Sequence, residues 1–499
     1  MAVLRPGLRF LIADGVCSQV VGVLAGGVLS GGAFVVALAL LMGASNAVIG
    51  AIAAIPPLAQ LLQVPAISIV NRIRRRRLIS VVCSGVGRIF LLCICFLPLL
   101  APAAWRVPLL LAALCLYFGL NAISACAFNS WMRDLLPMQM MGAVFGRRMA
   151  IGTVIGAALS LAAGFGVDIV AARSGDPRPV YSLLFIVAGI FGLVGTCFIA
   201  RIPEPPMRPP RPLGLLALLS EPLRHENYRN LLVFIGVWNA AVNMAAPFFV
   251  VYMLKQIGLS MGYVLSLTVL SQIVNAVFFR IWGRIADRFT NKSALTVAGP
   301  LFILTFIVWP FTTMPGPYFL TVPMLIAIHV LAGVSTAGVN LCAGNLAIKS
   351  APYGEATAYL AVNAFVSGVT AAIAPILAGL AADWFDLNHL TLTLSWTSTA
   401  AGQAHTWGLP AVDLEGLDFV FLIAFIVGLY AIHRLLAVKE EGEVEEEIVV
   451  QELYAEVRKA VANISNVAGL RHLTYFPYAV LQYLRGKKAT VSEDDLRSL

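Results

Sequence analysis

Long apolar runs separated by short polar or basic segments follow one another along the chain as far as residue 437. A helix needs about 20 mostly apolar residues to cross a bilayer, and twelve runs reach roughly that length. The first and the tenth are the longest, so we expect a tilt or a break in these two. The runs lie at 15–41, 46–69, 78–101, 107–130, 147–170, 180–200, 230–254, 262–283, 293–312, 320–347, 357–382 and 417–437. The pattern predicts an all-α membrane protein with twelve transmembrane helices.

The composition supports the bilayer as the solvent of this chain. Of its 499 residues, 60% are hydrophobic and 12% are charged, whereas about a quarter of the residues of a soluble domain are charged. The first run extends beyond the h-region of a signal peptide, which has about 7–15 residues, so we expect it to remain in the protein. The eight cysteines lie inside apolar runs and lack the CxxC spacing of zinc ligands. We interpret them as small apolar side chains and expect no metal, cofactor or disulfide.

Basic residues are distributed unevenly between the two sides of the predicted bundle. One side carries 20 Lys and Arg residues, and the other carries four: Arg106, Arg173, Arg178 and Lys255. The positive-inside rule places the larger set in the cytoplasm, together with both chain termini. We therefore expect a multi-pass protein of the plasma (inner) membrane. The net charge of +9 follows from this topology and indicates no nucleic-acid partner.

The chain is expected to divide into two halves and a tail. Residues 201–229 form a proline-rich connection after six predicted spans, where a linker between two six-helix halves, 1–200 and 230–438, is expected. The halves resemble each other at an offset of 215 residues, as two halves in a parallel repeat do in one large class of transporters. Four landmarks coincide at this offset: Gly43-Ala44-Ser45 with Gly258-Leu259-Ser260, Pro137 with Pro352, Gly164 with Gly379, and Asp168 with Asp383.

The tail, residues 439–499, is expected on the cytoplasmic side. Six of the eight residues at 440–447 are Glu. Apolar residues then recur at helical spacing, which predicts an amphipathic helix; they are Leu453, Val457, Val461 and Ile464. The later segment 470–488 mixes aromatic and basic residues. Two interpretations stay open for it: an interfacial segment on the inner leaflet, or a solvated tail that never docks.

A loop motif between the eighth and ninth spans carries a family resemblance. Residues 283–292 read Gly-Arg-Ile-Ala-Asp-Arg-Phe-Thr-Asn-Lys, which resembles the G-x-x-x-D-R-x-G-R/K pattern of major facilitator superfamily transporters at this place. Asn291 departs from the pattern. The equivalent first-half loop, 67–77, lacks the Gly and the Asp but is strongly basic. The resemblance covers about residues 10–437 and implies twelve helices in two six-helix halves.

In that family such loops latch the two halves together on the cytoplasmic side. The resemblance implies two crossed contacts in this chain, one between Asp287 and the start of the fifth helix, and one between the first basic loop and the start of the eleventh. Basic residues that serve topology alone are the open alternative. The expected gating motif consists of Gly283, Asp287, Arg288, Lys292, Arg72, Arg147, Arg148 and Glu355.

Polar residues inside the spans are costly and often functional. In the family the first, fourth, seventh and tenth helices line a central cavity, so polar residues of these helices are substrate-cavity candidates. Asn239 and Asn243 share one helix face, as a binding wall requires. For each Asn, hydrogen bonds that join neighbouring helices are the alternative, and we expect a structural role for His329. The candidates are Asp14, Gln19, Asn121, Trp238, Asn239, Asn243 and Asn340, with Arg88 of the third span.

Arg88 and Asp14 are the charges to explain. Arg88 lies about ten residues into its span, roughly 15 Å along the helix axis at 1.5 Å per residue. A lone Arg at such a depth costs at least ~2.5–3.5 kcal/mol, so it needs a partner or water. Asp14 is the favoured partner. Two other interpretations of Asp14 stay open: a proton site, or a residue that reaches the cytoplasmic interface.

These features favour a secondary transporter that moves a small solute by alternating access, as an expected monomer. Proton coupling stays open, because the spans lack several deep carboxylates and the fifth lacks the Gly-Pro element of the family's antiporter motif. The phosphate-loop, HExxH and GxSxG patterns are missing from the sequence, so we expect neither an enzyme nor an ATP-driven pump. A non-transporting scaffold or sensor that uses the tail is the alternative.

Overall fold

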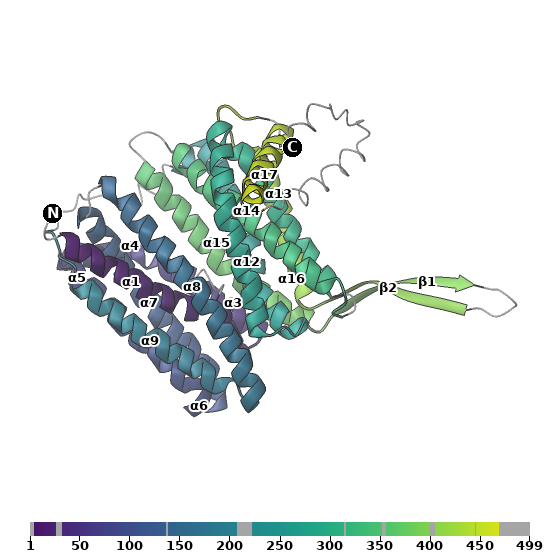
Figure 1. Cartoon of the computed structure of the whole chain (residues 1–499), viewed down its shortest axis with the longest axis horizontal. Coiled ribbons are helices and arrows are strands. Elements are labelled where there is room, and N and C mark those ends of the chain that lie inside the picture. The colour runs from purple at the N-terminus through teal and green to yellow at the C-terminus, as the bar shows by residue number, and fades with distance from the viewer. Residues whose placement is uncertain are drawn as a thin grey trace.

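The computed structural model is a helical bundle from which one β-hairpin projects (Figure 1). It describes residues 4–25, 32–135, 138–206, 222–313, 316–351, 356–398, 405–444 and 446–468. Before residue 201 the described residues form nine α-helices, with a 3₁₀ turn at Ile94–Phe96. They are α1 (Leu4–Leu24), α2 (Ala33–Leu41), α3 (Asn46–Leu61), α4 (Gln63–Ile73), α5 (Arg76–Cys93), α6 (Leu97–Leu100), α7 (Ala103–Leu135), α8 (Met138–Ser174) and α9 (Arg178–Ala200).

From Glu226 on, the described part of the chain forms seven α-helices and two strands. A π-helical turn (Tyr252–Gln256) extends the first of these helices, and a 3₁₀ turn (Trp309–Thr312) extends the third. The elements are α11 (Glu226–Val251), α12 (Met261–Arg288), α13 (Asn291–Val308), α14 (Thr321–Lys349), α15 (Ala356–Phe385), β1 (His389–Ser398), β2 (His405–Glu415), α16 (Leu417–Leu436) and α17 (Glu446–Ala468).

Helices occupy every predicted span within the described residues. Ten of them are long and apolar enough to cross a membrane, and α3 with α4, which meet at 41°, give an eleventh span. The first predicted span holds two helices, α1 and α2, so the break expected there is present. The tenth is the continuous helix α14. The chain is therefore an integral, multi-pass membrane protein.

Helix α8 begins earlier than the sequence analysis predicts. The apolar run of the fifth span starts near residue 147, whereas the helix starts at Met138. Hydropathy detects only the part of a helix that needs an apolar solvent, and backbone hydrogen bonds continue the helix beyond it. Arg148 therefore lies in the third turn of α8 and not at its start.

The helices form two groups that lie side by side (Figure 1). Helices α1–α9 make one group and α11–α16 the other. We call the end of the bundle at which α1 begins and α16 ends the terminal end, and the opposite end, where α15 leads into β1, the hairpin end. The two groups pack together through α3 on α15 and α8 on α12.

The hairpin is a two-stranded antiparallel sheet that the sequence analysis did not anticipate. Its register pairs His389 with Glu415 and Ser398 with His405, with an irregularity after Leu392. The alternation of Leu and Thr at 390–394 is the period-two pattern of a strand. The hairpin extends away from the bundle, so its strands pair only with each other among the described residues.

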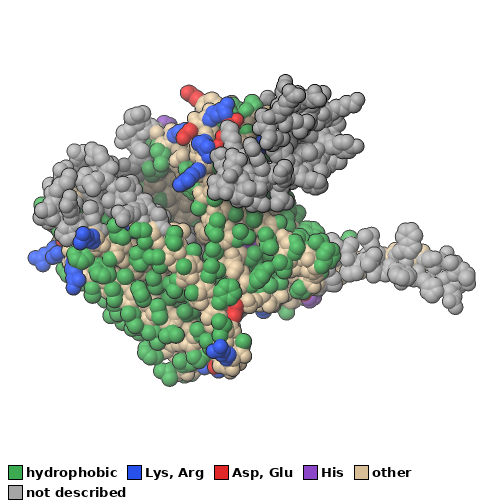
Figure 2. Space-filling model, viewed as in Figure 1, with side chains coloured by type: hydrophobic (Ala, Val, Ile, Leu, Met, Phe, Trp, Pro, Cys, Tyr) green, Lys and Arg blue, Asp and Glu red, His purple; other side chains and the backbone are tan. Residues whose placement is uncertain are grey.

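The surface of the bundle has the distribution that a bilayer requires. Apolar side chains cover its flank, and most Lys and Arg side chains visible on this face gather at the terminal end (Figure 2). Large apolar residues such as Val154 and Ile273, 71% and 60% exposed, point outward from mid-helix positions. Such exposure is costly in water and neutral in lipid.

Candidate functional site

At the hairpin end, one short sequence pattern shapes two helix starts in the same way. Gly43 and Gly258 have φ angles of 84° and 77°, in the left-handed region that glycine adopts without strain. Two residues later, the Ser45 hydroxyl accepts a hydrogen bond from the third residue of α3, and the Ser260 hydroxyl does the same for α12. These are N-caps, and they leave the first two N–H groups of each helix unpaired.

A carboxylate of the other group of helices binds the unpaired N–H groups of α12. Asp168, near the end of α8, accepts one hydrogen bond from Met261 N at 2.9 Å and one from Gly262 N at 2.7 Å. The first turn of a helix carries partial positive charge, and hydrogen bonds to an ionised acceptor are short and strong. Asp168 therefore fastens the first group of helices to the second.

The reverse contact is made at the start of α3. Asp383, near the end of α15, accepts hydrogen bonds from Asn46 N at 2.8 Å and from Ala47 N at 2.9 Å. Asp386 adds a third bond, because its Oδ2 accepts from Asn46 Nδ2 at 2.9 Å. The two groups are thus joined by a reciprocal pair of helix caps, which we call the crossed caps (Asp168 on α12, Asp383 on α3).

Two glycines let the capped helices come close enough for these bonds. A Cβ atom at Gly164 would lie 3.1 Å from Gly262 Cα, and one at Gly379 would overlap the Asn46 carbonyl. Any larger residue at either position would push the helix pair apart and lengthen the hydrogen bonds of the carboxylate one turn further along. Gly164 and Gly379 are therefore part of the same contact.

Sequence reasoning found the members of this contact but not the contact. Asp168 and Asp383 fall on each other at the 215-residue offset, and so do the two Gly-x-Ser segments. The sequence shows them only as marks of a repeat. The missing step is spatial: the repeat itself does not show that the carboxylate of one half meets the helix start of the other.

Inside the first group of helices, Asp14 lies between two arginines. The Asp14 side chain on α1 is buried, at 1% exposure. Its Oδ2 is 2.7 Å from Arg148 Nη2 on α8, and its Oδ1 is 3.9 Å from Arg88 Nη2 on α5. The predicted pairing of Asp14 with Arg88 is present, but Arg148 is the closer cation. The burial of Asp14 among these side chains disfavours its interpretation as a residue that reaches the cytoplasmic interface.

Arg88 is satisfied mainly by α9. Its Nη1 donates to the Gly192 carbonyl and to the Thr196 hydroxyl, and the residue is 5% exposed. Small residues make room for the cluster, because a Cβ at Gly195 would lie 3.2 Å from Asp14 Oδ1. The arrangement links α1, α5, α8 and α9 through one carboxylate with two cations, so a change in its charge acts on four helices at once.

At the terminal end, the motif loop between α12 and α13 binds the tail. Three basic residues of the motif each pair with a Glu of the tail: Arg284 with Glu456 at 2.8 Å, Arg288 with Glu452 at 2.5 Å, and Lys292 with Glu443 at 2.7 Å. Lys349, at the end of α14, pairs with Glu440 at 3.5 Å. On α17, Val449 is fully buried. The start of the tail, residues 440–458, therefore packs against the bundle, whereas the segment 470–488, for which two interpretations stay open, lies outside the described residues.

At this end, both groups of helices contain a helix start whose backbone N–H donates to a Glu carboxylate. The Arg76 backbone N–H, at the start of α5, donates to Glu204 at 2.6 Å, and the Lys292 backbone N–H, at the start of α13, donates to Glu440 at 2.8 Å. Both Glu residues follow the last helix of their own group. The buried Arg76 side chain also pairs with Asp134 at 2.6 Å. Each basic loop is thus bound by the chain segment that directly follows its own group of helices.

Among the described residues, the latch contact predicted for Asp287 is not formed. Asp287 is exposed and makes no hydrogen bond or ion pair with any described residue. Arg148, its expected partner, is held by Asp14 instead. Arg72 is exposed. A Cβ atom at Gly283 would meet no atom closer than 3.8 Å, so no close helix approach requires a glycine there. Glu355 and the side chain of Arg147 lie outside the described residues.

The other cavity candidates are dispersed. Asn121 donates to the Tyr117 carbonyl of its own helix, and Gln19 packs against Gly152. Asn340 is exposed. These contacts neither bring the three residues together nor give them a common hydrogen-bond partner.

On α11, the candidates make packing and interhelical contacts. Trp238 is buried, with its ring 5.8 Å from that of Phe302. Asn239 Nδ2 donates to Ser367 Oγ of α15 at 3.3 Å, and Asn243 donates to the Asn239 carbonyl. His329 Nδ1 lies 2.8 Å from the carbonyl oxygen of residue 325, in keeping with the structural role expected for it.

Comparison with known proteins adds the family. The profile of the Major Facilitator Superfamily matches residues 18–375. The fold is similar to that of the nucleoside transporter NupG, with a TM-score of 0.60 and 13% identity over 88% of this chain and 99% of that one. It is also similar to a D-xylose-proton symporter, with a TM-score of 0.57 and 16% identity over 89% of this chain and 99% of that one. A third similar fold is that of a bacterial homologue of the iron transporter ferroportin in an inward-facing state, with a TM-score of 0.59 and 12% identity over 87% of this chain and 99% of that one. No curated protein matches the chain.

Proposed function

Because the chain belongs to the Major Facilitator Superfamily, and is thereby a secondary transporter of a small solute, we propose that the crossed caps are one of its two gates. Alternating access requires that the two halves separate at one end while they meet at the other. The observation that carries the proposal is the reciprocal capping of α12 by Asp168 and of α3 by Asp383. The family match gives no support to the scaffold or sensor alternative.

We propose further that residues 1–200 and 230–438 are the two moving halves, joined by 201–229, and that the terminal end faces the cytoplasm. The 20-to-4 distribution of basic residues supports this orientation. The protein would then reside in the plasma (inner) membrane as a monomer, and the structure would correspond to an inward-facing state, because the hairpin end is the joined one. A cysteine at position 398, in a cysteine-free background, should react with a membrane-impermeant maleimide on intact cells. Protection there, with labelling of the central linker, would reverse the orientation.

Proton coupling is the second part of the proposal, with Asp14 as its site. Protonation of a buried carboxylate removes its attraction for nearby cations, and Arg148 on α8 lies 2.7 Å from Asp14. Helix α8 carries both Arg148 and Asp168, so a displacement of α8 at Asp14 would also move the carboxylate of the gate. The Asp14→Asn variant should take up solute without an accompanying proton flux, measured with a pH-sensitive dye inside proteoliposomes.

Uptake of solute through the gate can be tested without knowledge of the natural solute. Solved structures of similar fold suggest a first panel: nucleosides, D-xylose, a thioalcohol-conjugated peptide and 5-aminolevulinic acid. In a cysteine-free background, Ala47→Cys and Asp383→Cys place two thiols across the gate. Oxidation should stop uptake of any solute that the protein carries, and a reducing agent should restore it. Uptake that continues through the cross-linked protein would contradict the gate.

A further inference from the structure

The β-hairpin has two chemically different sides. Successive residues of a strand lie on opposite faces, so every second cross-strand pair belongs to the same face. Counted from the base, the second, fourth, sixth and eighth pairs of the register consist of apolar residues. We call the side on which they lie the apolar face. Its pairs are Leu390 with Leu414, Leu392 with Val412, Leu394 with Leu409, and Trp396 with Trp407.

The irregularity in the register keeps the apolar residues on one side. Val412 and Pro410 pair with consecutive residues of β1, which leaves Ala411 as an extra residue, a β-bulge. The apolar residues of β2 change from even to odd positions at this point. In an unbroken register Trp407 and Leu409 would lie on the opposite side, because a step of one residue reverses the face. The bulge therefore preserves the separation of the two sides.

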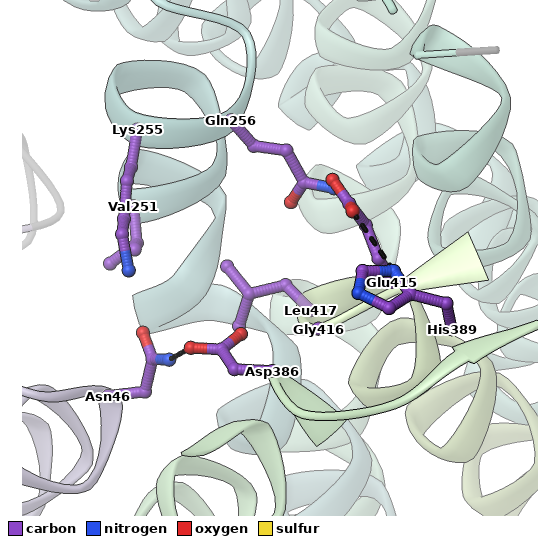
Figure 3. A pocket seen from close by; sticks show the side chains of 9 residues that line it. All are labelled: Asn46, Val251, Lys255, Gln256, Asp386, His389, Glu415, Gly416 and Leu417. Atoms are coloured by element: carbon purple, nitrogen blue, oxygen red, sulfur yellow. Dashed lines mark hydrogen bonds and ion pairs between the residues drawn. The ribbon is translucent and has the colours of Figure 1, made fainter. Parts of the chain in front are cut away.

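The other side of the hairpin is polar, and at its base it faces a polar hollow. Its first pair is His389 with Glu415, whose side chains lie 3.4 Å apart (Figure 3). Both residues line a hollow of about 330 Å³ at the end of α11, together with Lys255, Gln256 and Asp386. A space of this size with charged walls is suited to water, so this side of the hairpin faces solvent. The other residues of β1 on the polar side are Thr391, Thr393, Ser395 and Thr397.

The apolar face continues a row of exposed apolar residues on α15. Leu380 and Trp384 lie one turn apart on this helix, which is long and apolar enough to cross the membrane. Leu387 follows in the turn after the helix, and Leu390 and Leu392 follow in β1. Each of these five residues is more than half exposed. Exposed apolar residues on a membrane-crossing helix contact lipid, so the row leads from the lipid-facing side of α15 directly onto the hairpin.

The direction of the hairpin fits a position along the membrane surface. The hairpin leaves the bundle sideways, across the direction of α12 rather than along it (Figure 1). Membrane-crossing helices tilt on average only about 20° from the bilayer normal, so a ribbon that runs across them follows the surface. The outer edge of each strand has no strand beside it among the described residues. Hydrocarbon cannot satisfy such edges, so the ribbon belongs at the level of the headgroups, where Trp residues are enriched.

We propose that the hairpin rests flat on the leaflet at the hairpin end, with its apolar face against lipid and its polar side toward water. Residues 389–415 include no Lys or Arg, so attraction to anionic headgroups contributes nothing and the contact is apolar. The last pair, Ser398 with His405, is polar and lets the tip of the ribbon stay in water. Because α15 and α16 hold the hairpin beside the membrane, even a small contact is occupied.

The size of the apolar face argues against a second copy of the chain as its partner. The face extends from Leu390 to Trp396, roughly 23 Å at about 3.3 Å per residue, and two strands are roughly 10 Å wide. A flat area of about 230 Å² is far below the ~800 Å² that each partner contributes to a stable protein interface. Lipid needs no such minimum, because the hairpin is already tethered at the membrane.

Collision rates of spin labels test the proposal in the full-length, cysteine-free protein in nanodiscs of phosphatidylcholine. A nitroxide at Leu392→Cys, on the apolar face, should collide more often with oxygen, which concentrates in lipid, than with a water-soluble nickel chelate. A nitroxide at Thr391→Cys, the neighbour on the polar side, should do the reverse, and the ratio of the two rates should differ severalfold between these positions. Leu380→Cys on α15 gives the reference for lipid, and Glu441→Cys, exposed in the tail, gives the reference for water.

Each other outcome overturns the assignment. A ratio close to the Glu441→Cys value at both positions would mean that the hairpin stands free in water. Low collision rates with both reagents at Leu392→Cys would mean that protein covers the apolar face, and spin–spin broadening that vanishes on dilution with unlabelled protein would identify a second copy. Contrast that appears only after addition of phosphatidylglycerol would replace the apolar contact by a headgroup contact. If Leu392→Cys does not fold, Leu390→Cys takes its place under the same criteria. The assay measures contact with lipid and not uptake, so its result is independent of that of the proposed gate.

Discussion

Replacement of Asp383 by Asn changes the gate while it preserves the shape of the side chain. The carboxylate makes two hydrogen bonds of 2.8 and 2.9 Å to the start of α3, and Asn can keep only one acceptor oxygen, without the charge. The contact exists only while the hairpin end is joined. We therefore expect Asp383→Asn to shift the population toward the state in which the hairpin end is open. The substituted residue does not contact the Asp14 cluster, so the shift would arise at the gate itself.

The size of the shift follows from the type of contact. A carboxylate at a helix N-terminus stabilises by about 0.3–1 kcal/mol when exposed and by up to ~2 kcal/mol when partly buried. Charge-assisted hydrogen bonds fall in a similar range, about 1.5–3 kcal/mol. A loss of about 1–2 kcal/mol changes the population ratio by about 5–30-fold. Asp168→Asn should act in the same direction with a similar size, because the opposite contact has the same geometry.

The distance between spin labels on the two groups of helices measures this shift. Positions 173 and 319 are exposed and lie at the hairpin end, one on each group. Both variants should add or enlarge a population at longer distance. Asp176→Asn, the exposed carboxylate at the same end that binds its own neighbour Arg178, should leave the distribution unchanged. An unchanged distribution in both Asp383→Asn and Asp168→Asn, or an equal change in the control, would refute the gate.

Three further predictions concern stability. Asp14→Asn leaves Arg88 and Arg148 without their carboxylate and should destabilise the protein by about 3–5 kcal/mol. The unfolding temperature, measured by tryptophan fluorescence, should fall in this variant. Addition of Arg148→Gln should restore part of the loss. Glu440→Gln should lower the unfolding temperature more than Glu452→Gln, because Glu440 binds the Lys292 backbone N–H at 2.8 Å whereas Glu452 pairs with Arg288, whose side chain is 62% exposed; equal effects would contradict this order. Burial raises the pKa of Glu443, but its hydrogen bonds from Lys292 and the Glu440 backbone outweigh this and leave the pKa below the usual 4.5. The stabilisation by Glu443 is thus fully present above about pH 4.5 and is lost as the pH falls below that value, so wild type and Glu443→Gln should converge in unfolding temperature at acidic pH.

Hydropathy was a good guide to the helices because each span must satisfy the bilayer independently of its neighbours. The burial of Arg88 could be predicted for the same reason, since a charge at that depth has few options. Helix ends were harder. The start of α8 at Met138 lies outside the apolar run, so hydropathy does not show that Arg148 lies well inside the helix, where it pairs with Asp14.

The gate and the tail contacts depend on tertiary placement, which periodicity does not contain. Asp168 looks like any acidic residue near a helix end until α12 is known to begin beside it. Likewise, the Glu-rich start of the tail and the basic motif loop are far apart in the sequence, and opposite charge alone does not select one pairing. The alternation of Leu and Thr in β1, in contrast, was a readable strand signal that a search for apolar runs passes over.

The crossed caps have the form of an isologous interface, in which each partner offers the same patch to the other. Each half contributes one serine-capped helix start and one carboxylate near a helix end. The carboxylate of each half binds the helix start of the other half. Each half thus contains one copy of both parts of the contact, a helix start and a carboxylate. The covalent linker between the halves is therefore not needed to specify how they meet at the hairpin end. Separately expressed halves, 1–200 and 230–499, contain all the parts of this contact and should find each other in the membrane.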